Sequence, residues 1–136
     1  MTEERLIHFR DGGEIRITAA AGRLAMGTQQ VKRGTGIPTH RHFEMEEAFY
    51  VLEGSGTYTL DDVAERFERG ATLLIPKNRW HGFANPDEEL LLLWVVTPAG
   101  LEGFFRETCA RPGEAPKQLT REERAAIALR YGTEFR

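Results

Sequence analysis

The hydrophobic residues of this chain recur in short alternating runs that glycine, proline and aspartate interrupt. In the run at 14–18, for example, Ile15 and Ile17 alternate with charged or polar neighbours, as expected for a strand with one buried face. The runs that predict strands are 14–18, 24–31, 48–52, 57–60, 63–67, 72–75 and 90–97, and Asp61-Asp62 predicts a hairpin turn. Many short strands separated by turn residues indicate an all-β sandwich or barrel.

The run at 90–97 is apolar on both faces, so both faces need cover. One face is expected to point into the barrel, and the other to meet a helix or a second subunit. The alternation does not decide which residues point inward, so Trp94 faces either a ligand or a partner. Because a small barrel also exposes sheet edges, we expect a homodimer.

The last part of the chain changes character. Residues 110–117 carry Pro112, Gly113 and Pro116, which is typical of a connector. Thr120 and Glu123 then form a capping-box pattern, and 124–131 predicts a helix that ends at Gly132 in a left-handed C-cap. We therefore expect a barrel with N-terminal strands over 1–110, and a connector with a C-terminal α-helix packed on that barrel over 111–136.

Composition narrows the class of protein. The 136 residues suit one domain, and the net charge of -3 provides no basic surface for nucleic acid. The longest apolar run, 90–96, is too short to cross a membrane, and the polar residues 1–5 do not resemble a signal peptide. Cys109 is the single cysteine, which excludes a disulfide within the chain and a cysteine cluster for zinc. We expect a cytoplasmic protein without a nucleic-acid or membrane partner.

Three of the four histidines, together with one glutamate, carry the candidate chemistry: His40, His42, Glu47 and His81. On a strand, the spacing of two between His40 and His42 places both rings on one face and turns Arg41 away. Imidazole nitrogens and a carboxylate oxygen suit one divalent transition metal, namely Fe, Mn, Ni, Zn or Cu, and the ligand set does not choose among them.

The spacing around these residues is similar to two motifs of the cupin superfamily. The first is Gly34, five residues, His40-x-His42, four residues, Glu47, six residues, Gly54; the second is Gly70, five residues, Pro76, four residues, His81, three residues, Asn85. The resemblance covers roughly 14–98 and implies a double-stranded β-helix (jelly-roll) barrel. It also implies a metal held at one end by His40, His42, Glu47 and His81. The tail resembles that of small single-domain bacterial cupins, many of them labelled quercetinase-like.

One residue departs from the family pattern, and one alternative ligand exists. Asn78 stands where the second motif usually has glycine, which implies a positive φ that asparagine tolerates. Glu46 could replace Glu47 as the ligand, but only Glu47 keeps six residues before Gly54. With Glu47 as the ligand, Phe49 and Val51 share the ligand face, and 48, 50 and 52 point away.

The predicted pocket is apolar. Phe49, Val51 and Phe83 share the inward parity, and Met45 is placed at the mouth, although ordinary core packing explains all four equally well. Phe104-Phe105 is interpreted as an anchor for the C-terminal segment, with a lid as the alternative. His8 is expected at the surface.

These features favour a metal-dependent enzyme that acts on a small organic ligand or substrate. The resemblance implies dioxygenase-like oxidation of an enol, β-diketone or phenolic compound, with the metal centre as the reactive group and Glu47 as a candidate base. The alternatives are a non-redox Lewis-acid isomerase, cyclase or lyase, and a non-catalytic ligand-binding cupin. A sensor domain of a transcription regulator is disfavoured, because the chain has no helix-turn-helix pattern.

Overall fold

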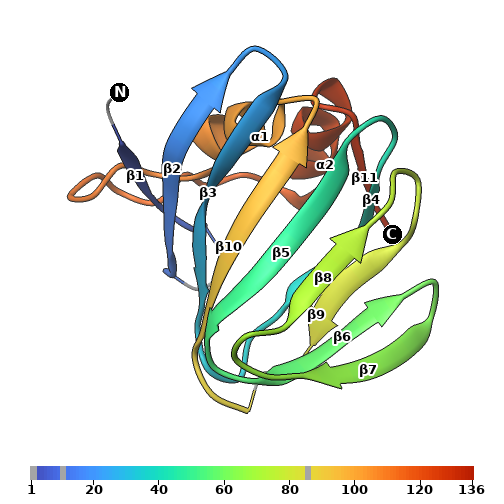
Figure 1. Ribbon diagram of the computed structural model, residues 1–136. Helices are drawn as coiled ribbons and strands as arrows, with labels where there is room; N and C mark the ends of the chain where they lie inside the picture. Colours follow the sequence, from blue (N-terminus) through green and yellow to red (C-terminus); the bar gives the residue numbers. More distant parts are fainter. Residues whose placement is uncertain (1–2, 10–11, 85–86) are drawn as a thin grey trace.

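The computed structural model describes residues 3–9, 12–84 and 87–136, and about half of them lie in β-strands (Figure 1). The strands are β1 (Glu4–Ile7), β2 (Glu14–Ala21), β3 (Leu24–Val31), β4 (Ile37–His42), β5 (Glu46–Glu53), β6 (Gly56–Leu60), β7 (Val63–Phe67), β8 (Thr72–Ile75), β9 (His81–Ala84), β10 (Leu90–Thr97) and β11 (Thr133–Phe135). The helices are α1 (Leu101–Thr108) and α2 (Arg121–Arg130), and neither is long and apolar enough to span a membrane. Asn85 of the second motif lies outside the described residues.

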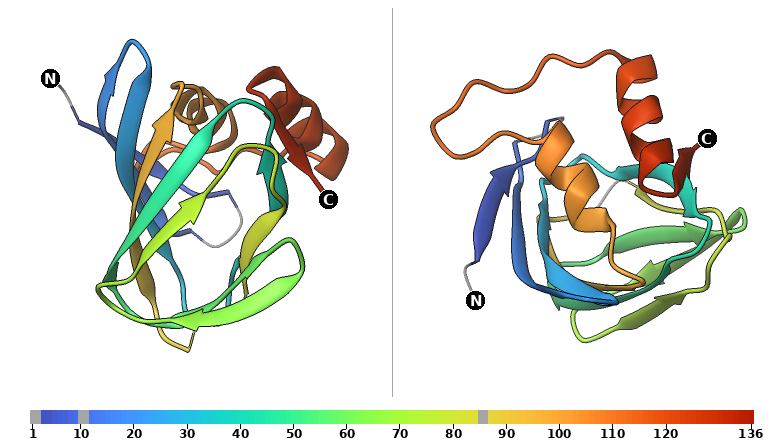
Figure 2. Two further views of the ribbon diagram at one scale, coloured as in Figure 1. Left: turned by 45° about the vertical axis from the view of Figure 1, so that its right-hand side comes forward. Right: turned by 90° about the horizontal axis from the view of Figure 1, so that it is seen from above.

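The strands form two antiparallel sheets that face each other. One sheet has the order β1-β2-β3-β10-β5-β8, and the other has the order β11-β4-β9-β6-β7. Figure 1 and the left view of Figure 2 show the two sheets on opposite sides of a shared interior. The jelly-roll prediction is confirmed. Since β5 belongs to the first sheet and β4 and β9 to the second, side chains from these three strands can meet inside the barrel.

Alternation of side chains sets the strand faces as predicted. In β5, Glu47, Phe49 and Val51 are buried, whereas Tyr50 is 44% exposed. The hairpin between β6 and β7 turns at Asp61 and Asp62, which have φ values of 48° and 67°. Asn78 has a φ of 66°, so the departure from glycine falls at a left-handed position, as expected.

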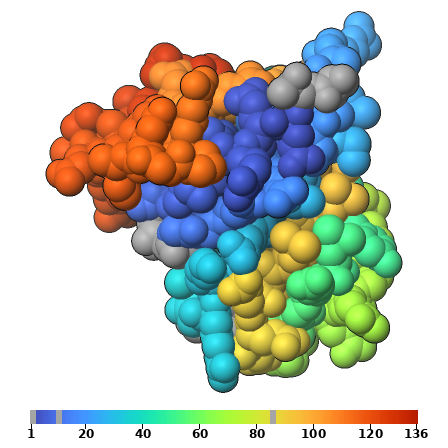
Figure 3. All heavy atoms as spheres, turned by 90° about the vertical axis from the view of Figure 1, so that its left-hand side faces the viewer, coloured from blue at the N-terminus to red at the C-terminus, as the bar shows by residue number. Residues whose placement is uncertain are grey.

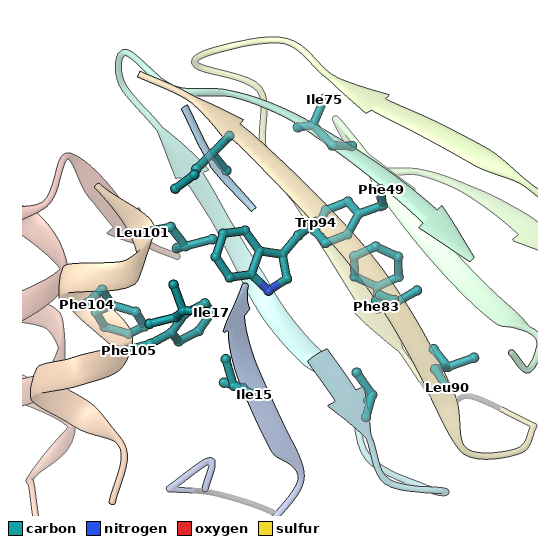
Figure 4. Packing of buried hydrophobic residues seen from close by; sticks show 14 of the residues in the cluster. Ile15, Ile17, Phe49, Ile75, Phe83, Leu90, Trp94, Leu101, Phe104 and Phe105 are labelled. Atoms are coloured by element: carbon teal, nitrogen blue, oxygen red, sulfur yellow. The ribbon is translucent and has the colours of Figure 1, made fainter. Parts of the chain in front are cut away.

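Strand β10 shows which face points inward, which the sequence left open. Leu90, Leu92, Trp94 and Val96 are fully buried, and the residues between them are half-buried on the opposite face. The Trp94 ring lies 5.7 Å from that of Phe105, centroid to centroid. Figure 4 shows Trp94 between the α1 side chains and the barrel residues Phe49 and Phe83. The core therefore runs continuously from the barrel interior to α1.

The C-terminal segment forms a cap at one end of the barrel. Seen from above in Figure 2, α1 and α2 lie over this end. Figure 3 shows the connector between the helices (orange) beside the N-terminal strands (blue), where Ala110 pairs with Ile7. The capping box of Thr120 and Glu123 is present, and Gly132 has a φ of 72°, as predicted.

Two elements of the cap were not predicted. Helix α1 is short and contains Gly103, which lowers its intrinsic helix propensity. A Cβ at this position would clash with the ring of Tyr131, so the glycine allows the two segments to pack closely. The second is strand β11. It pairs with β4, so residues 133–135 form the edge strand of the five-stranded sheet.

Candidate metal centre

The four predicted ligands converge on one point inside the barrel. His40 and His42 lie on β4, His81 lies on the neighbouring strand β9, and Glu47 reaches across from β5 in the opposite sheet. His40 and His81 are directly opposite each other in the strand register, and their ring centroids are 4.2 Å apart. One ligand atom from each of the four residues lies within 4.8 Å of the others. Glu46 is exposed, so the structure selects Glu47 over the alternative.

Hydrogen bonds hold the three imidazoles in place. Nδ1 of His40 donates to the carbonyl of Pro38 (2.7 Å), and Nδ1 of His81 donates to the carbonyl of Arg79 (2.9 Å). A carbonyl can only accept, so in both rings Nδ1 carries a hydrogen, which leaves Nε2 as the nitrogen that can bind a metal. Nδ1 of His42 lies 2.7 Å from the hydroxyl of Thr133 on β11, to which it donates when Nε2 serves as the ligand.

In the part of the chain that the structure describes, three of the candidate ligand atoms lack a hydrogen-bond partner. Nε2 of His42 and Nε2 of His81 are each 3.3 Å from Oε1 of Glu47, and none of these three buried atoms makes a hydrogen bond within the described residues. Buried polar atoms without a partner cost free energy unless something binds them. A divalent cation satisfies all of them at once, so the residues fit a metal that three nitrogens and one oxygen would hold.

Electrostatics prepares the group for a cation at neutral pH. Burial, followed by the neighbouring His81 and His42, lowers the pKa of His40 to about 3. Burial alone would raise the pKa of Glu47, but the adjacent imidazoles of His42 and His81 outweigh it and bring that pKa to about 2. His40 is therefore neutral and Glu47 is ionised, which are the states that bind a metal.

A cavity of about 460 Å³ leads from this group to the surface. Its inner end contains His40, His42 and Glu47, which are all buried. Its walls are mainly apolar and come from both sheets and the cap; they include Ile37, Phe49, Leu101, Phe104, Phe105 and Phe135. Arg121 and Arg136 line the cavity and are exposed, so they mark its outer end.

Of the four predicted pocket residues, only Phe49 lines this cavity; Met45, Val51 and Phe83 do not. Strand alternation correctly predicts that the side chains of Val51 and Phe83 point into the barrel. It does not predict how far along the barrel axis each side chain lies from the cavity. Two residues along a strand are about 6.6 Å, which carries Val51 past Phe49 and Phe83 past His81 into the packed interior. Phe83 packs edge-to-face against Phe49 there, with centroids 5.0 Å apart. Met45 is buried beside Gly100 and does not lie at the mouth.

Other lining residues were missed or interpreted differently from the sequence. His8, which was expected at the surface, is half-buried and lines the cavity. Phe104 and Phe105 anchor the cap and also form part of the cavity wall. Thr133 contacts His42, yet no motif in the sequence marks it. Only the long-range pairing of β11 with β4 brings this threonine to the site.

Comparison with known proteins places these features in a family. Residues 27–96 match the model of the Cupin domain family. Protein SchB of Streptomyces halstedii is 36% identical over an alignment of 113 positions that covers 72% of this chain and 82% of SchB.

Solved structures share the fold at lower identity. The structure of KdgF from Halomonas sp. has a TM-score of 0.65 and 20% identity, over 69% of this chain and 86% of that one. Pac13, a nucleoside dehydratase from Streptomyces, has a TM-score of 0.57 and 20% identity, over 71% of this chain and 77% of its own.

Proposed function

This chain belongs to the cupin family, and from that premise we propose that it is a divalent-metal-dependent enzyme that oxidises a small enolic or phenolic substrate in a dioxygenase-like reaction. The observation that carries the proposal is the position of the ligand group, which ends an apolar cavity that opens to the surface. A bound metal would act as a Lewis acid that holds a chelating oxygen ligand while O₂ approaches.

The protein's own residues account for the choice of a compact, flat substrate. Phe49, Phe104 and Phe135 line the cavity, and aromatic side chains favour edge or stacked contacts with a planar ring. Apart from the ligand group, the buried polar side chains that line the cavity are those of Gln29 and Thr133. The walls therefore exclude water, and the substrate is oriented mainly through its oxygens at the inner end.

Glu47 is the candidate acid–base group. Among the residues that line the cavity it is the single side-chain carboxylate, and its low pKa keeps it ionised at neutral pH. Because a carboxylate with so low a pKa is a weak base, it would accept a proton from an enol or phenol hydroxyl only when the metal makes that hydroxyl more acidic.

The test begins with metal analysis of protein that was purified without added metal. Protein reconstituted with Fe(II) under anaerobic conditions is then mixed with air-saturated enols, β-diketones and phenols, and O₂ uptake is recorded. We expect O₂ consumption that matches substrate loss in the wild-type protein and is absent in Glu47→Gln. A metal-loaded protein that consumes no O₂ with any compound of the panel would contradict the oxidative reaction.

A non-redox isomerase, cyclase or lyase is the second candidate. It is supported by the structural similarity to Pac13, which is a dehydratase, although that similarity concerns the fold alone. This candidate predicts that zinc-loaded protein converts its substrate in the absence of O₂. Tight metal and ligand binding without turnover in either assay would instead indicate a non-catalytic binding protein.

We also propose that the protein is cytoplasmic and that it belongs to the quercetinase-like subgroup. We further propose that it forms a homodimer. The outer faces of β5 and β8 expose Tyr50 (44%) and Leu74 (69%), next to the half-buried outer residues of β10. An apolar face of this kind is suited to a second copy of the chain. Size-exclusion chromatography with light scattering should give twice the monomer mass, and a purely monomeric species would contradict this proposal.

A further inference from the structure

The outer end of the cavity carries positive charge. Arg121, Arg124 and Arg136 line it, and Arg124 is half-buried whereas the other two are exposed. Among the lining residues the single side-chain carboxylate is that of Glu47, which lies at the inner end within the ligand group. The cavity thus combines an apolar middle with a cationic mouth, although the chain as a whole has a net charge of -3.

Arg124 is held in place without being neutralised. Its guanidinium lies 4.9 Å from the centre of the Phe9 ring, and its Nη1 donates to the carbonyl of Leu119 (2.7 Å). These contacts fix the direction of the side chain and leave its other N–H groups available to a ligand. A guanidinium that is oriented in advance loses little entropy when an anion binds.

The arginines of the mouth differ in how they are paired. Arg136 makes two hydrogen bonds to Asp62, which compensates its charge. Neither Arg121 nor Arg124 forms an ion pair among residues 3–9, 12–84 and 87–136. Many other arginines of the chain are paired with a carboxylate: Arg5 and Arg16 with Glu14, Arg66 with Asp87, Arg106 with Glu4, and Arg130 with Glu107. Two uncompensated cations therefore face one cavity, and a bound anion would compensate them.

We infer that the ligand of this cavity carries an anionic oxygen group, such as a carboxylate, which Arg121 and Arg124 bind at the mouth. The inference rests on the proposed function, in which the enolic or phenolic oxygens of the same molecule lie at the ligand group. Its planar body then spans the apolar middle between Phe104 and Phe135. The planar fork of a guanidinium matches the two oxygens of a carboxylate, and a charge-assisted hydrogen bond is stronger than a neutral one.

The experiment uses catechol and three catechols that carry a carboxylate on zero, one or two methylenes: protocatechuate, homoprotocatechuate and dihydrocaffeate. Each is titrated anaerobically into the full chain loaded with Ni(II), and binding is read from the visible absorption of the metal. Because catechol lacks the anion, it reports on the inner end alone. The three tail lengths allow for the distance between the two ends of the cavity.

In the wild-type protein we expect at least one carboxylate probe to bind about tenfold or more tightly than catechol. Arg121→Gln and Arg124→Gln should each remove most of this preference without changing the affinity for catechol, and Arg124→Lys should restore part of it. Arg111→Gln is the matched control: it removes an exposed charge outside the cavity lining and should leave the preference intact. The preference should also weaken as the salt concentration rises.

Three outcomes would overturn the inference, and they separate it from the proposed function. Equal affinity for catechol and for every carboxylate probe would overturn it while leaving the metal-dependent function in place. A preference that survives both glutamine variants would do the same, because the anion would then bind elsewhere. Failure to bind Ni(II), or to bind any catechol once Ni(II) is bound, would remove the proposed function and the inference together.

Discussion

The two ends of the cavity are built in different ways. The inner end consists of four side chains on three adjacent or facing strands, all between residues 40 and 81, and hydrogen bonds from imidazoles to backbone carbonyls orient His40 and His81. The outer end comes from both extremes of the chain: Phe9 near the start, and α1, α2 and β11 at the finish. The comparison teaches that the candidate metal ligands belong to the barrel, whereas most of the outer cavity wall belongs to the cap.

The largest expected effect is on metal affinity, and it distinguishes Glu47 from Glu46 as the metal ligand. Glu47→Gln should weaken divalent-metal affinity by more than about 100-fold, since even the loss of a hydrogen bond to a ligand costs roughly 10–100-fold. Glu46→Gln, one residue away on the exposed face, is the control and should leave affinity unchanged. Competition with a chromophoric chelator measures both. If Glu46→Gln instead lost more metal affinity than Glu47→Gln, Glu46 would be the ligand, and the strand register would be shifted by one residue.

Acid should also act on the inner end. The pKa of His40 is about 3 in the folded protein and about 6.5 when unfolded, so between these values the unfolded chain binds more protons. The metal-free protein should therefore keep its full stability above pH 6.5 and lose several kcal/mol as pH falls toward 3. Glu47 acts in the same direction at lower pH, from 4.5 to about 2. Urea unfolding at a series of pH values measures this loss.

A variant controls for the other titrating groups. His40→Gln should flatten the pH dependence between 4 and 6, because the buried imidazole contributes most there. Parallel stability profiles for wild type and variant would show that His40 does not carry the effect.

Removal of an aromatic side chain from the cap should lower the stability of the protein without changing the metal affinity of the inner end. Phe104 is buried and contacts Phe105 and Phe135, so Phe104→Ala should cost about 3–5 kcal/mol of unfolding free energy. Leu129→Ala, on the exposed side of α2, is the control and should cost under about 0.5 kcal/mol. Metal affinity should stay within a few-fold in both variants. Loss of metal in Phe104→Ala would show that the two ends are not separable.

The smallest expected effect concerns the side-chain hydrogen bond between Thr133 of the outer end and His42 of the inner end. Thr133→Val should weaken metal affinity roughly tenfold, because His42 loses the acceptor that orients its ring. Thr133→Ser keeps the hydroxyl and should behave like the wild type. Equal affinity in all three proteins would show that β11 does not position the ligand.

The inner end could be predicted from the sequence because its determinants are local. Strand alternation placed His40 and His42 on one face, and the interval to Gly54 distinguished Glu47 from Glu46. The left-handed conformation of Asn78 also followed from the motif. Each of these inferences needs only neighbouring residues and the geometry of an extended strand.

The outer end could not be predicted, because its elements depend on tertiary contacts. Strand β11 has three residues, too few for a pattern, and α1 carries a glycine that only the ring of Tyr131 explains. Arg121 and Arg124 look like ordinary solvated residues of a surface helix. The sequence also does not predict how far along the barrel axis a side chain lies. For that reason the prediction that Val51 and Phe83 line the cavity is wrong, and both fill the core.

The most direct measurement of the central claim is X-ray absorption spectroscopy of the protein loaded with one equivalent of Ni(II), together with the metal-to-chain ratio. The account predicts one ion per chain, a first shell of nitrogen and oxygen without sulfur, and outer-shell scattering from three imidazoles. No tight uptake of a divalent metal, or a bound ion with at most one imidazole around it, would contradict it.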